Sequence, residues 1–286
     1  MERYYIDLNK CLGEDFSEYE FDDQGIPLNH LYPASGGSYN PITVCQYGLF
    51  HFNKFVDSGD SSARTTFLAQ ANWLIQSARP GANDSSVWPY HFDLPFYNIT
   101  APWISGMAQG EALSVLVRAF SLSQDHAYLA VAHNAWNIFA VNVGQGGVMS
   151  GFPDGSPLVE EYPTPGHVTA VLNGFIFAIF GVYDYWKFTG NEDAGQLYRQ
   201  LIQSLAANLH RYDSGYWSYY ELKSPKRLAS RSYHRLHLEQ LQKLYDIAPE
   251  PQFAHYLNRF SVYQESTRCK IRWTIHKLGQ KIFWRV

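Results

Sequence analysis

Apolar residues recur at helical spacing along most of the chain from residue 41 to residue 265. Eight segments show this period, and they form pairs joined by the short connections DSGDSS, SQD, TGNED and APEP. Gly, Asp and Pro in these connections end one helix and cap the next. The segments span residues 42–56, 63–78, 110–123, 126–141, 169–189, 192–210, 237–247 and 251–264. The pattern predicts a mainly α protein of about four helical hairpins.

The connections between successive pairs are longer and rich in Gly, Pro and aromatic residues. They cover residues 79–103, 144–166 and 211–233. Hairpins with long loops at one end describe an α/α toroid, an incomplete barrel with a cleft at its mouth. Helical hairpins can also stack into an open solenoid. The long irregular loops favour the toroid, because functional residues of rigid scaffolds collect on loops.

The two ends of the chain differ from the helical part. Residues 1–40 are predicted to be an irregular N-terminal extension with a short β-hairpin near FDDQGIPL. Residues 41–265 would form the α/α barrel, and the basic, aromatic tail 266–286 would pack on it as a strand or helix. Contact of this tail with a membrane surface or a partner is the alternative.

Composition narrows the classes of function. Apolar residues make up 46% of the chain and charged residues 17%, which is typical of a folded protein. The net charge of −4 argues against nucleic acid as a partner. Aromatic residues reach 16%, a content that suits either a sugar-binding cleft or an aromatic core between helices. Three cysteines without paired spacing indicate neither a disulfide framework nor a zinc site, and they favour a reducing compartment.

Targeting and cofactor signals are not found in the sequence. It begins with the polar stretch MERYYIDLNK, and no segment approaches the roughly 20 apolar residues of a membrane span. We therefore expect a cytoplasmic protein, or one peripheral to a membrane-bound glycan-synthesis complex, without obligatory membrane insertion. Phosphate loops, dinucleotide fingerprints, nucleophile elbows and spaced metal ligands are not found, so no metal and no cofactor is expected.

Positive charge is concentrated in one segment of this acidic chain. Five of the 22 Lys and Arg residues fall between Lys223 and Arg235. Such a local cluster favours an anionic substrate, and its alternative is a solvated, basic helix end. Within it, SYHRLH sets Tyr233 beside Arg231, His234 and Arg235. Positive neighbours lower the pKa of a tyrosine from its usual value of about 10. This stretch therefore predicts either that Tyr233 acts as a base or that its side chains are simply exposed on the protein surface.

A second group of candidates precedes an apolar helix. LVEEYPT places Glu161 and Tyr162 in a loop, and a solvated turn is the simpler explanation of its paired glutamates. Asn173 follows on an otherwise apolar face, where a buried amide needs partners. SGYWSYYELK carries Tyr220 and Lys223, with a packed aromatic hairpin as the alternative.

A weaker candidate is the helix entrance PWISGMAQGEAL, with Ser105, Met107 and Gln109. Free N–H groups at a helix start favour anions, but the spacing itself fits simple capping better. Taken together, the side chains that could do chemistry are tyrosines, a carboxylate and cations. This set suits removal of a proton next to a carboxylate, because cations stabilise the enolate while a phenolate takes the proton.

Four longer stretches make the chain recognisable. NPITVCQYGLFHFNK, PWISGMAQGEALSVLVRAFSLSQD, EEYPTPGHVTAVLNGFIFAIFGVYDYW and RSYHRLHLEQLQKL together resemble the D-glucuronyl C5-epimerase family over about residues 38–265. This family acts on heparan-type polysaccharides, and its catalytic part is an α/α barrel. Animal members carry a membrane anchor and a β-rich portion before the barrel, where this chain has residues 1–40. The resemblance is therefore to the catalytic C-terminal domain, in a short, prokaryote-like form.

The resemblance implies catalytic roles for particular residues. Glu161 and Tyr162 of EEYPT would line the reaction centre, and Tyr220 and Tyr233 would be the tyrosines nearest C5. Lys223, at a position usually held by arginine in animal members, would pair with the uronate carboxylate. The other expected substrate contacts are Arg227, Arg231, His234, Arg235, Asn173, Phe177, Gln109, Met107, Ser105 and Tyr39.

The resulting hypothesis is an isomerase that inverts C5 of D-glucuronate to L-iduronate within a heparosan-like or other uronate-containing glycan. Its partner would be that anionic polysaccharide. A homodimer is also consistent with the resemblance and with the aromatic tail. A polysaccharide lyase or uronyl glycoside hydrolase on the same toroid is one alternative. A non-catalytic glycan-binding module is the other.

Overall fold

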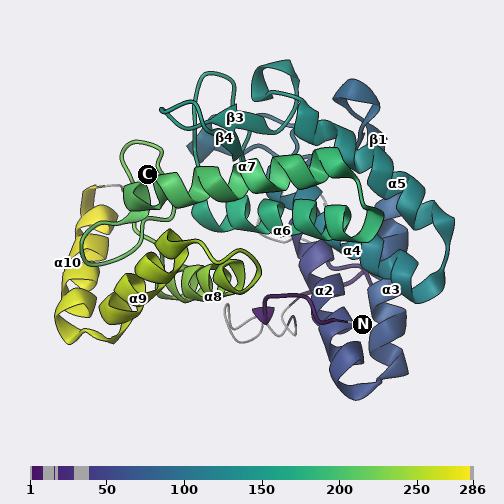
Figure 1. Ribbon diagram of the computed structural model, residues 1–286, viewed down its shortest axis with the longest axis horizontal. Helices are drawn as coiled ribbons and strands as arrows, with labels where there is room; N and C mark the ends of the chain where they lie inside the picture. The colour runs from purple at the N-terminus through teal and green to yellow at the C-terminus, as the bar shows by residue number, and fades with distance from the viewer. Residues whose placement is uncertain (1, 9–15, 17–18, 29–38, 284–286) are drawn as a thin grey trace.

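The computed structural model describes residues 2–8, 16, 19–28 and 39–283, and the side chains as far as residue 279. Helices within these residues pair into four hairpins, and one further helix follows (Figure 1). The hairpins are α2 (Pro41–Ser58) with α3 (Ser61–Ser77), α4 (Gly106–Ser123) with α5 (His126–Trp136), α6 (Leu172–Thr189) with α7 (Glu192–Asn208), and α8 (Arg231–Ile247) with α9 (Pro251–Glu265); α10 (Thr267–Phe283) is last. The mainly α fold predicted from the sequence is confirmed.

Three of the hairpins use the same turn. A residue in the left-handed conformation ends the first helix, and an Asp or Asn directly after it caps the second. The pairs are Gly59 with Asp60, Gln124 with Asp125, and Gly190 with Asn191. Each capping side chain accepts a hydrogen bond from a main-chain N–H of the helix that follows, which satisfies a donor left free at the helix start.

The inner layer of the toroid is the series α2, α4, α6 and α8, in which each helix packs on the next. Helices α4 and α6 are buried over nearly their whole length and cross very closely. A Cβ added to Gly181 of α6 would lie 2.0 Å from the carbonyl oxygen of Gly110 in α4. One added to Gly110 would lie 2.5 Å from the Cα of Ala178. Only glycine allows this approach of two helix backbones.

A buried ion pair reinforces this crossing. Arg118 of α4 donates through Nη2 to Oδ1 of Asp184 in α6 at 3.2 Å, and through Nη1 to the other carboxylate oxygen. Ser114 adds a hydrogen bond of 2.6 Å to the same carboxylate. Because each charge is out of water, losing either partner would leave the other uncompensated.

The N-terminal residues belong to the toroid. The main-chain N–H of Tyr4 donates to Asn53 of α2 at 2.7 Å, and that of Asp7 donates to Glu239 of α8 at 3.1 Å. This segment therefore bridges the first and last inner helices. The expected hairpin near FDDQGIPL consists of one antiparallel bridge between Phe21 and Pro27. The remainder of the predicted extension, residues 9–15, 17–18 and 29–38, lies outside the described residues.

Two short sheets stiffen the long loops. Strand β1 (Arg79–Pro80) pairs antiparallel with β2 (Ser86–Val87), and β3 (Met149–Gly151) pairs antiparallel with β4 (Pro157–Val159). In the second sheet Ser150 lies opposite Leu158. These strands hold the loops that follow the first and second hairpins close to the barrel.

The C-terminal tail is helical. Trp273 of α10 packs against the hydrophobic core and donates a hydrogen bond of 2.9 Å to the carbonyl oxygen of Ala229. Residues 284–286 of the tail lie outside the described part of the chain. Among the described helices, none is both long and apolar enough to pass through a lipid bilayer.

The glycine crossing gives a testable prediction about stability. Gly181→Ala should lower the free energy of unfolding by about 1–3 kcal/mol or more, because its Cβ meets main-chain atoms that cannot rotate away. Gly279→Ala in α10 is the matched control, since its Cβ would meet no atom within 4 Å. The control should gain up to about 1 kcal/mol from helix propensity. Urea unfolding measures both, and equal stability of the two variants would contradict the crossing.

Candidate active site

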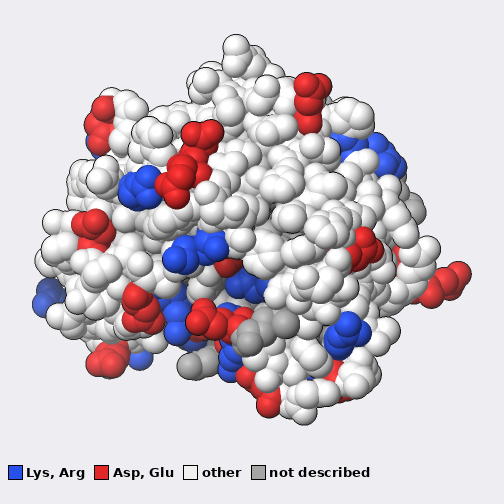
Figure 2. All heavy atoms as spheres, turned by 45° about the vertical axis from the view of Figure 1, so that its right-hand side comes forward, with Lys and Arg blue, Asp and Glu red and all other residues white. Residues whose placement is uncertain are grey.

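A cleft lies where the inner helices begin. Two adjoining cavities, of about 510 and 230 Å³, share Leu94, Tyr162 and Tyr233 in their walls. The first residues of α2, α4, α6 and α8 reach this cleft, together with the loops after the first three hairpins. A helix N-terminus carries partial positive charge, so four such ends favour an anionic ligand. Figure 2 shows one face of the molecule, where basic and acidic side chains together surround a hollow.

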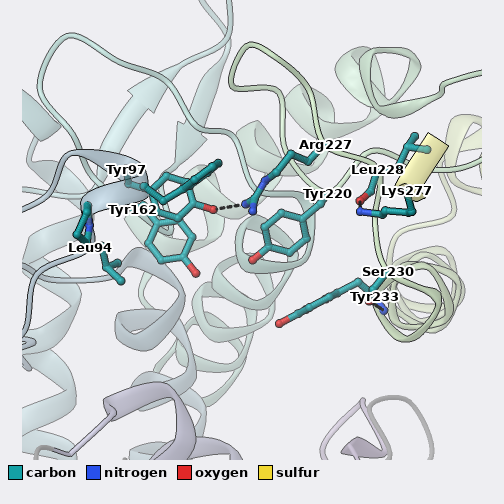
Figure 3. A pocket seen from close by; sticks show the side chains of 11 residues that line it. Leu94, Tyr97, Tyr162, Tyr220, Arg227, Leu228, Ser230, Tyr233 and Lys277 are labelled. Atoms are coloured by element: carbon teal, nitrogen blue, oxygen red, sulfur yellow. Dashed lines mark hydrogen bonds between the residues drawn. The ribbon is translucent and has the colours of Figure 1, made fainter. Parts of the chain in front are cut away.

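Three of the expected tyrosines meet in the cleft. Figure 3 shows the hydroxyl groups of Tyr162, Tyr220 and Tyr233 directed into the same space. The rings of Tyr220 and Tyr233 make an edge contact with centroids 4.9 Å apart. The ring of Tyr162 stacks on Tyr97 at 4.1 Å. The structure thus brings together side chains from three separate parts of the chain.

The backbone around these tyrosines is fixed by hydrogen bonds. The carbonyl oxygen of Tyr220 accepts from the N–H of Leu172, the first residue of α6, at 3.0 Å. Ser230, the N-cap of α8, accepts from the N–H of Tyr233 at 3.1 Å. Both tyrosines therefore stand at the starts of inner helices, whose N–H groups hold them in place.

Burial sets the protonation of two of these phenols. It raises the pKa of Tyr162 and that of Tyr220 well above the usual value of 10, and the charge of Glu161 raises both further. For these residues desolvation outweighs the positive charge nearby. Both are therefore phenols, able to donate a proton, in the free protein.

The two glutamates of EEYPT have different surroundings. Glu160 is buried, and its carboxylate accepts hydrogen bonds from the N–H groups of Thr169 and Ala170 at 3.0 and 3.1 Å, and from two hydroxyls. Glu161 is also buried, but its Oε2 atom has no hydrogen-bond partner among the described residues. A solvated turn is thus wrong for this pair.

Glu161 is poised to exchange a proton near neutral pH. Burial, with a smaller contribution from the carboxylates of Glu221 and Glu160, raises its pKa from 4.5 to about 7, although the hydrogen bond with Tyr162 and the charge of Arg227 lower it. Gly174 makes room for the side chain, since a Cβ there would lie 2.1 Å from Oε2 of Glu161. An acid that titrates near pH 7 suits general acid–base catalysis.

Arg227 supplies the positive charge within the cleft. It pairs with the buried carboxylate of Glu221 and donates a hydrogen bond of 2.6 Å to the hydroxyl of Tyr97 (Figure 3). Lys223 lies at the rim instead, with its ammonium 4.4 Å from the ring centroid of Phe96 and bonded to that residue's carbonyl oxygen. Lys223, which the resemblance pairs with a uronate carboxylate, therefore lines neither cavity, whereas Arg227 lines the larger of the two.

Three further expected contacts line the inner part of the cleft, namely Asn173 and Phe177 of α6 and Met107 of α4. The main-chain carbonyl of Asn173 accepts from Gln240 of α8 at 3.0 Å. Its buried side-chain oxygen, by contrast, has no hydrogen-bond partner among the described residues. A sugar hydroxyl would satisfy this acceptor.

The other expected substrate contacts next to Tyr233 in the sequence point elsewhere. Arg231 lies over the ring of Trp273, and Arg235 lines a separate cavity beside the N-terminal segment. His234 is buried, stacked on Trp217 and hydrogen-bonded to the hydroxyl of Ser218 at 2.7 Å. The idea that these three residues contact substrate beside Tyr233 is therefore not supported by their positions.

Two residues of the weaker candidate at the start of α4, Ser105 and Gln109, have structural roles. Ser105 caps α4 by accepting from Ala108 at 3.4 Å, and buried Gln109 holds β2 through the main chain of Ser86 and Trp88. This is the capping alternative that the spacing favoured.

Tyr39 lies outside both cavities. It donates a hydrogen bond of 2.8 Å from its hydroxyl to Asp22 and packs against Trp73 of α3. The tyrosine therefore ties the turn at residues 21–28 to the first hairpin. A substrate contact of Tyr39 finds no support in this position.

Sequence reasoning missed several residues of the cleft. Glu221, which follows Tyr220 in the YYELK stretch, lines neither cavity. It holds Arg227 in the cleft wall through an ion pair, a contact that no local sequence pattern indicates. Leu94, Phe96 and Tyr97 belong to the long aromatic loop 79–103, which the sequence singled out only as a loop. Asn40, Thr43, Gln46, Ser230 and Lys277 are further polar residues in the walls of the two cavities.

Comparison with known proteins covers most of the chain. Residues 82–262 match the family described as D-glucuronyl C5-epimerase C-terminus. The D-glucuronyl C5-epimerase of Caenorhabditis elegans is 31% identical over 287 residues, which covers 93% of this chain and 44% of that protein. An uncharacterised protein of Methanocaldococcus jannaschii is 31% identical over 184 residues, covering 61% of this chain and 56% of the relative. The chain thus spans about half the length of these curated relatives.

Solved structures show the same architecture. Cellobiose 2-epimerase from Bacillus thermoamylovorans covers 90% of this chain and 71% of its own, with a TM-score of 0.62 and 10% identity. A family 76 glycoside hydrolase (mannosidase) from Bacteroides thetaiotaomicron covers 81% and 60%, with a TM-score of 0.52 and 14% identity. Identities this low establish the fold alone. The sequence match carries the assignment: the chain belongs to the D-glucuronyl C5-epimerase family.

Proposed function

We propose that this protein inverts C5 of D-glucuronate to L-iduronate within a heparosan-like glycan. The observation that carries the proposal is the meeting of Glu161, Tyr162, Tyr220 and Tyr233 in one cleft beside the guanidinium of Arg227. Membership of the epimerase family and the sequence likeness to the nematode D-glucuronyl C5-epimerase support the same reaction.

The first requirement is to make H5 acidic. A carbon next to a carboxylate loses its proton only if the enolate that forms is stabilised. Arg227 supplies a fixed positive charge for this, and Tyr97 and Glu221 hold its guanidinium in place. Lys223, at the rim, adds a second positive charge that steers the polymer toward the cleft.

The second requirement is a pair of proton carriers on opposite faces of the sugar. One group removes H5 as a proton, the electron pair passes into the carboxylate as an enolate, and a proton from the other face rebuilds the C5–H bond. Atoms and charge balance without any co-reactant. We assign the two roles to Tyr233 and to Glu161 with Tyr162, and Tyr220 orients the sugar or relays the proton.

The alternatives differ in what happens to the enolate or to the glycosidic bond. A lyase would expel the substituent at C4 from the same enolate. An inverting hydrolase needs two available carboxyl groups on either side of the bond. The second buried carboxylate near the cleft, Glu221, is ion-paired with Arg227, which argues against that role. A glycan-binding module would bind the polymer without turnover.

Incubation of the protein with heparosan in D2O tests the proposal. We expect deuterium at C5 and new iduronate signals by NMR, without the absorbance of an unsaturated uronate. Glu161→Gln and Tyr233→Phe should each lower inversion by about 10²–10⁴-fold, as expected for loss of a general acid or base. Tyr245→Phe, an exposed tyrosine on the same helix as Tyr233, is the control and should keep the wild-type rate.

Each alternative has its own signature in this experiment. Unsaturated product would indicate a lyase, new reducing ends without unsaturation would indicate a hydrolase, and polymer binding with no exchange at C5 would indicate a binding module. Any of these would overturn the proposal.

The raised pKa of Glu161 predicts a particular pH dependence. If its carboxylate is the base, kcat/KM should rise as pH increases through about 7, and Glu161→Gln should remove this limb. Stability should change in the opposite direction. The folded pKa of about 7 exceeds the usual 4.5, so folding binds a proton between these values and stability falls as pH rises through them.

Glu161→Gln removes this cost and should therefore become more stable than the wild type above pH 7. We expect an advantage of about 3 kcal/mol there, shrinking toward zero as pH falls to 4.5. Urea unfolding of both proteins across this range is the measurement. If the difference in stability between the two proteins does not depend on pH, the pKa of Glu161 is not raised in the folded protein.

A further inference from the structure

Helix α10 forms part of the cleft wall, although the family match ends at residue 262. Its inner face is bonded to the loop that carries Tyr220 and Arg227. Trp273 donates to the carbonyl of Ala229 at 2.9 Å, and Lys277 donates to the carbonyl of Leu228 at 2.6 Å. This helix therefore braces the catalytic loop and adds one cation of its own to the larger cavity.

The ammonium of Lys277 retains unused binding capacity. It has three donors, and the hydrogen bond to the carbonyl oxygen of Leu228 uses one of them. No carboxylate within salt-bridge distance of it is found among the described residues, whereas Arg227 pairs with Glu221. Partial burial, and to a lesser degree Arg227, lower the pKa of Lys277. An anionic ligand would compensate this desolvated charge.

The position of Lys277 separates it from the reaction centre. In Figure 3 it lies at one end of the cavity and Leu94 at the other, with the three tyrosines between them. We propose that Lys277 forms a subsite for an anionic group, a carboxylate or a sulfate, on a sugar that flanks the reacting uronate. The inference rests on the proposed function, because it assigns a second contact to the same polymer.

The test compares variants of Lys277 in the full chain. Lys277→Met should weaken equilibrium binding roughly tenfold by calorimetry, as expected for loss of a charged hydrogen bond, and raise KM with little change in kcat. The loss should be seen with heparosan if the group is a carboxylate, and with N-sulfated heparosan if it is a sulfate. Lys277→Arg should restore most of the affinity. Lys270→Met, which removes the same charge from an exposed position of α10, should bind like the wild type.

Two further substrates identify the anionic group. An oligosaccharide with a single uronate and no sulfate should bind all variants equally, because it has no second anion. A loss seen only with N-sulfated polymer would identify a sulfate, and a loss already seen with unsulfated heparosan a carboxylate. Equal affinity of Lys277→Met and wild type for both polymers would overturn the subsite. Absence of turnover in the wild type would instead contradict the proposed function. The binding of wild type and Lys277→Met can still be compared in that case, so the subsite is tested separately.

The outer face of α10 carries an independent feature. Ile271, Ile275 and Leu278 are 56%, 66% and 57% exposed, and their spacing places them on one side of the helix. Arg268, Lys270 and Arg272 flank this stripe and are also exposed. Residues 267–283 contain no Asp or Glu, although the whole chain has a net charge of −4.

We propose that this face of α10 lies on an anionic lipid surface. An exposed apolar stripe flanked by basic residues is typical of helices that bind at the membrane interface. A second copy is a poorer occupant, because pairing α10 with itself would bring its basic flanks together. Peripheral binding of this kind would place the cleft near a glycan made at a membrane.

Co-sedimentation of the full chain with lipid vesicles tests this surface. We expect binding to mixed phosphatidylcholine–phosphatidylglycerol vesicles that declines with salt, and none to pure phosphatidylcholine. Ile271→Ser combined with Ile275→Ser should lower the partition by on the order of tenfold or more. Phe188→Ser, an exposed apolar residue at the end of α6, is the matched control and should bind normally.

Two outcomes would overturn the membrane assignment. One is that the wild type fails to sediment with anionic vesicles or that the double variant sediments equally well. The other is a wild-type dimer in gel filtration that the double variant converts to a monomer, without vesicle binding, which would identify an interface between copies.

Discussion

The active-site geometry depends on the different hydrogen bonding of two adjacent buried glutamates. Glu160 uses its carboxylate to hold the start of the segment leading into α6, and its carbonyl oxygen accepts from Gly106 at the start of α4 at 2.9 Å. One residue therefore joins the entrances of both central helices. Because its position is fixed, Glu161 is carried into the cleft with an oxygen left unpartnered among the described residues. A desolvated acid of this kind is costly, and such costs persist where chemistry needs them.

Close backbone packing makes this arrangement feasible. Gly106 brings α4 against the main chain of Glu160, Gly174 leaves space for the carboxylate of Glu161, and Gly181 allows α4 and α6 to cross at backbone contact. A Cβ at Gly181 or Gly106 would meet main-chain atoms, and one at Gly174 would occupy the space of the Glu161 side chain. The same packing buries Tyr162 and Tyr220 and raises their pKa. The same packing contacts thus stabilise the fold and set the pKa values of these tyrosines.

The sequence predicted what depends on local pattern. Helix periods and capping residues gave the hairpins, and the family likeness gave Glu161, Tyr162, Tyr220 and Tyr233. The sequence did not predict which way a side chain points around its helix, or which residues from distant parts of the chain meet in the cleft. Arg231 lies two residues before Tyr233, which on a helix is a turn of about 200°, so its side chain faces Trp273. Tyr97 and Lys277 reach the cleft from distant parts of the chain, and no local pattern reports such contacts.

The electrostatics of the free site favour one division of labour. A buried phenol with a raised pKa is a poor base at neutral pH but keeps its proton available for donation. The carboxyl of Glu161, at about 7, passes between acid and base at little cost. In the proposed reaction, removal of H5 on the Glu161 side would therefore need less energy than removal by Tyr162 or Tyr220. Arrival of a uronate adds another negative charge and raises these pKa values further, unless Arg227 neutralises it. The cation beside the sugar thus controls both the acidity of C5 and the basicity of the group that removes its proton.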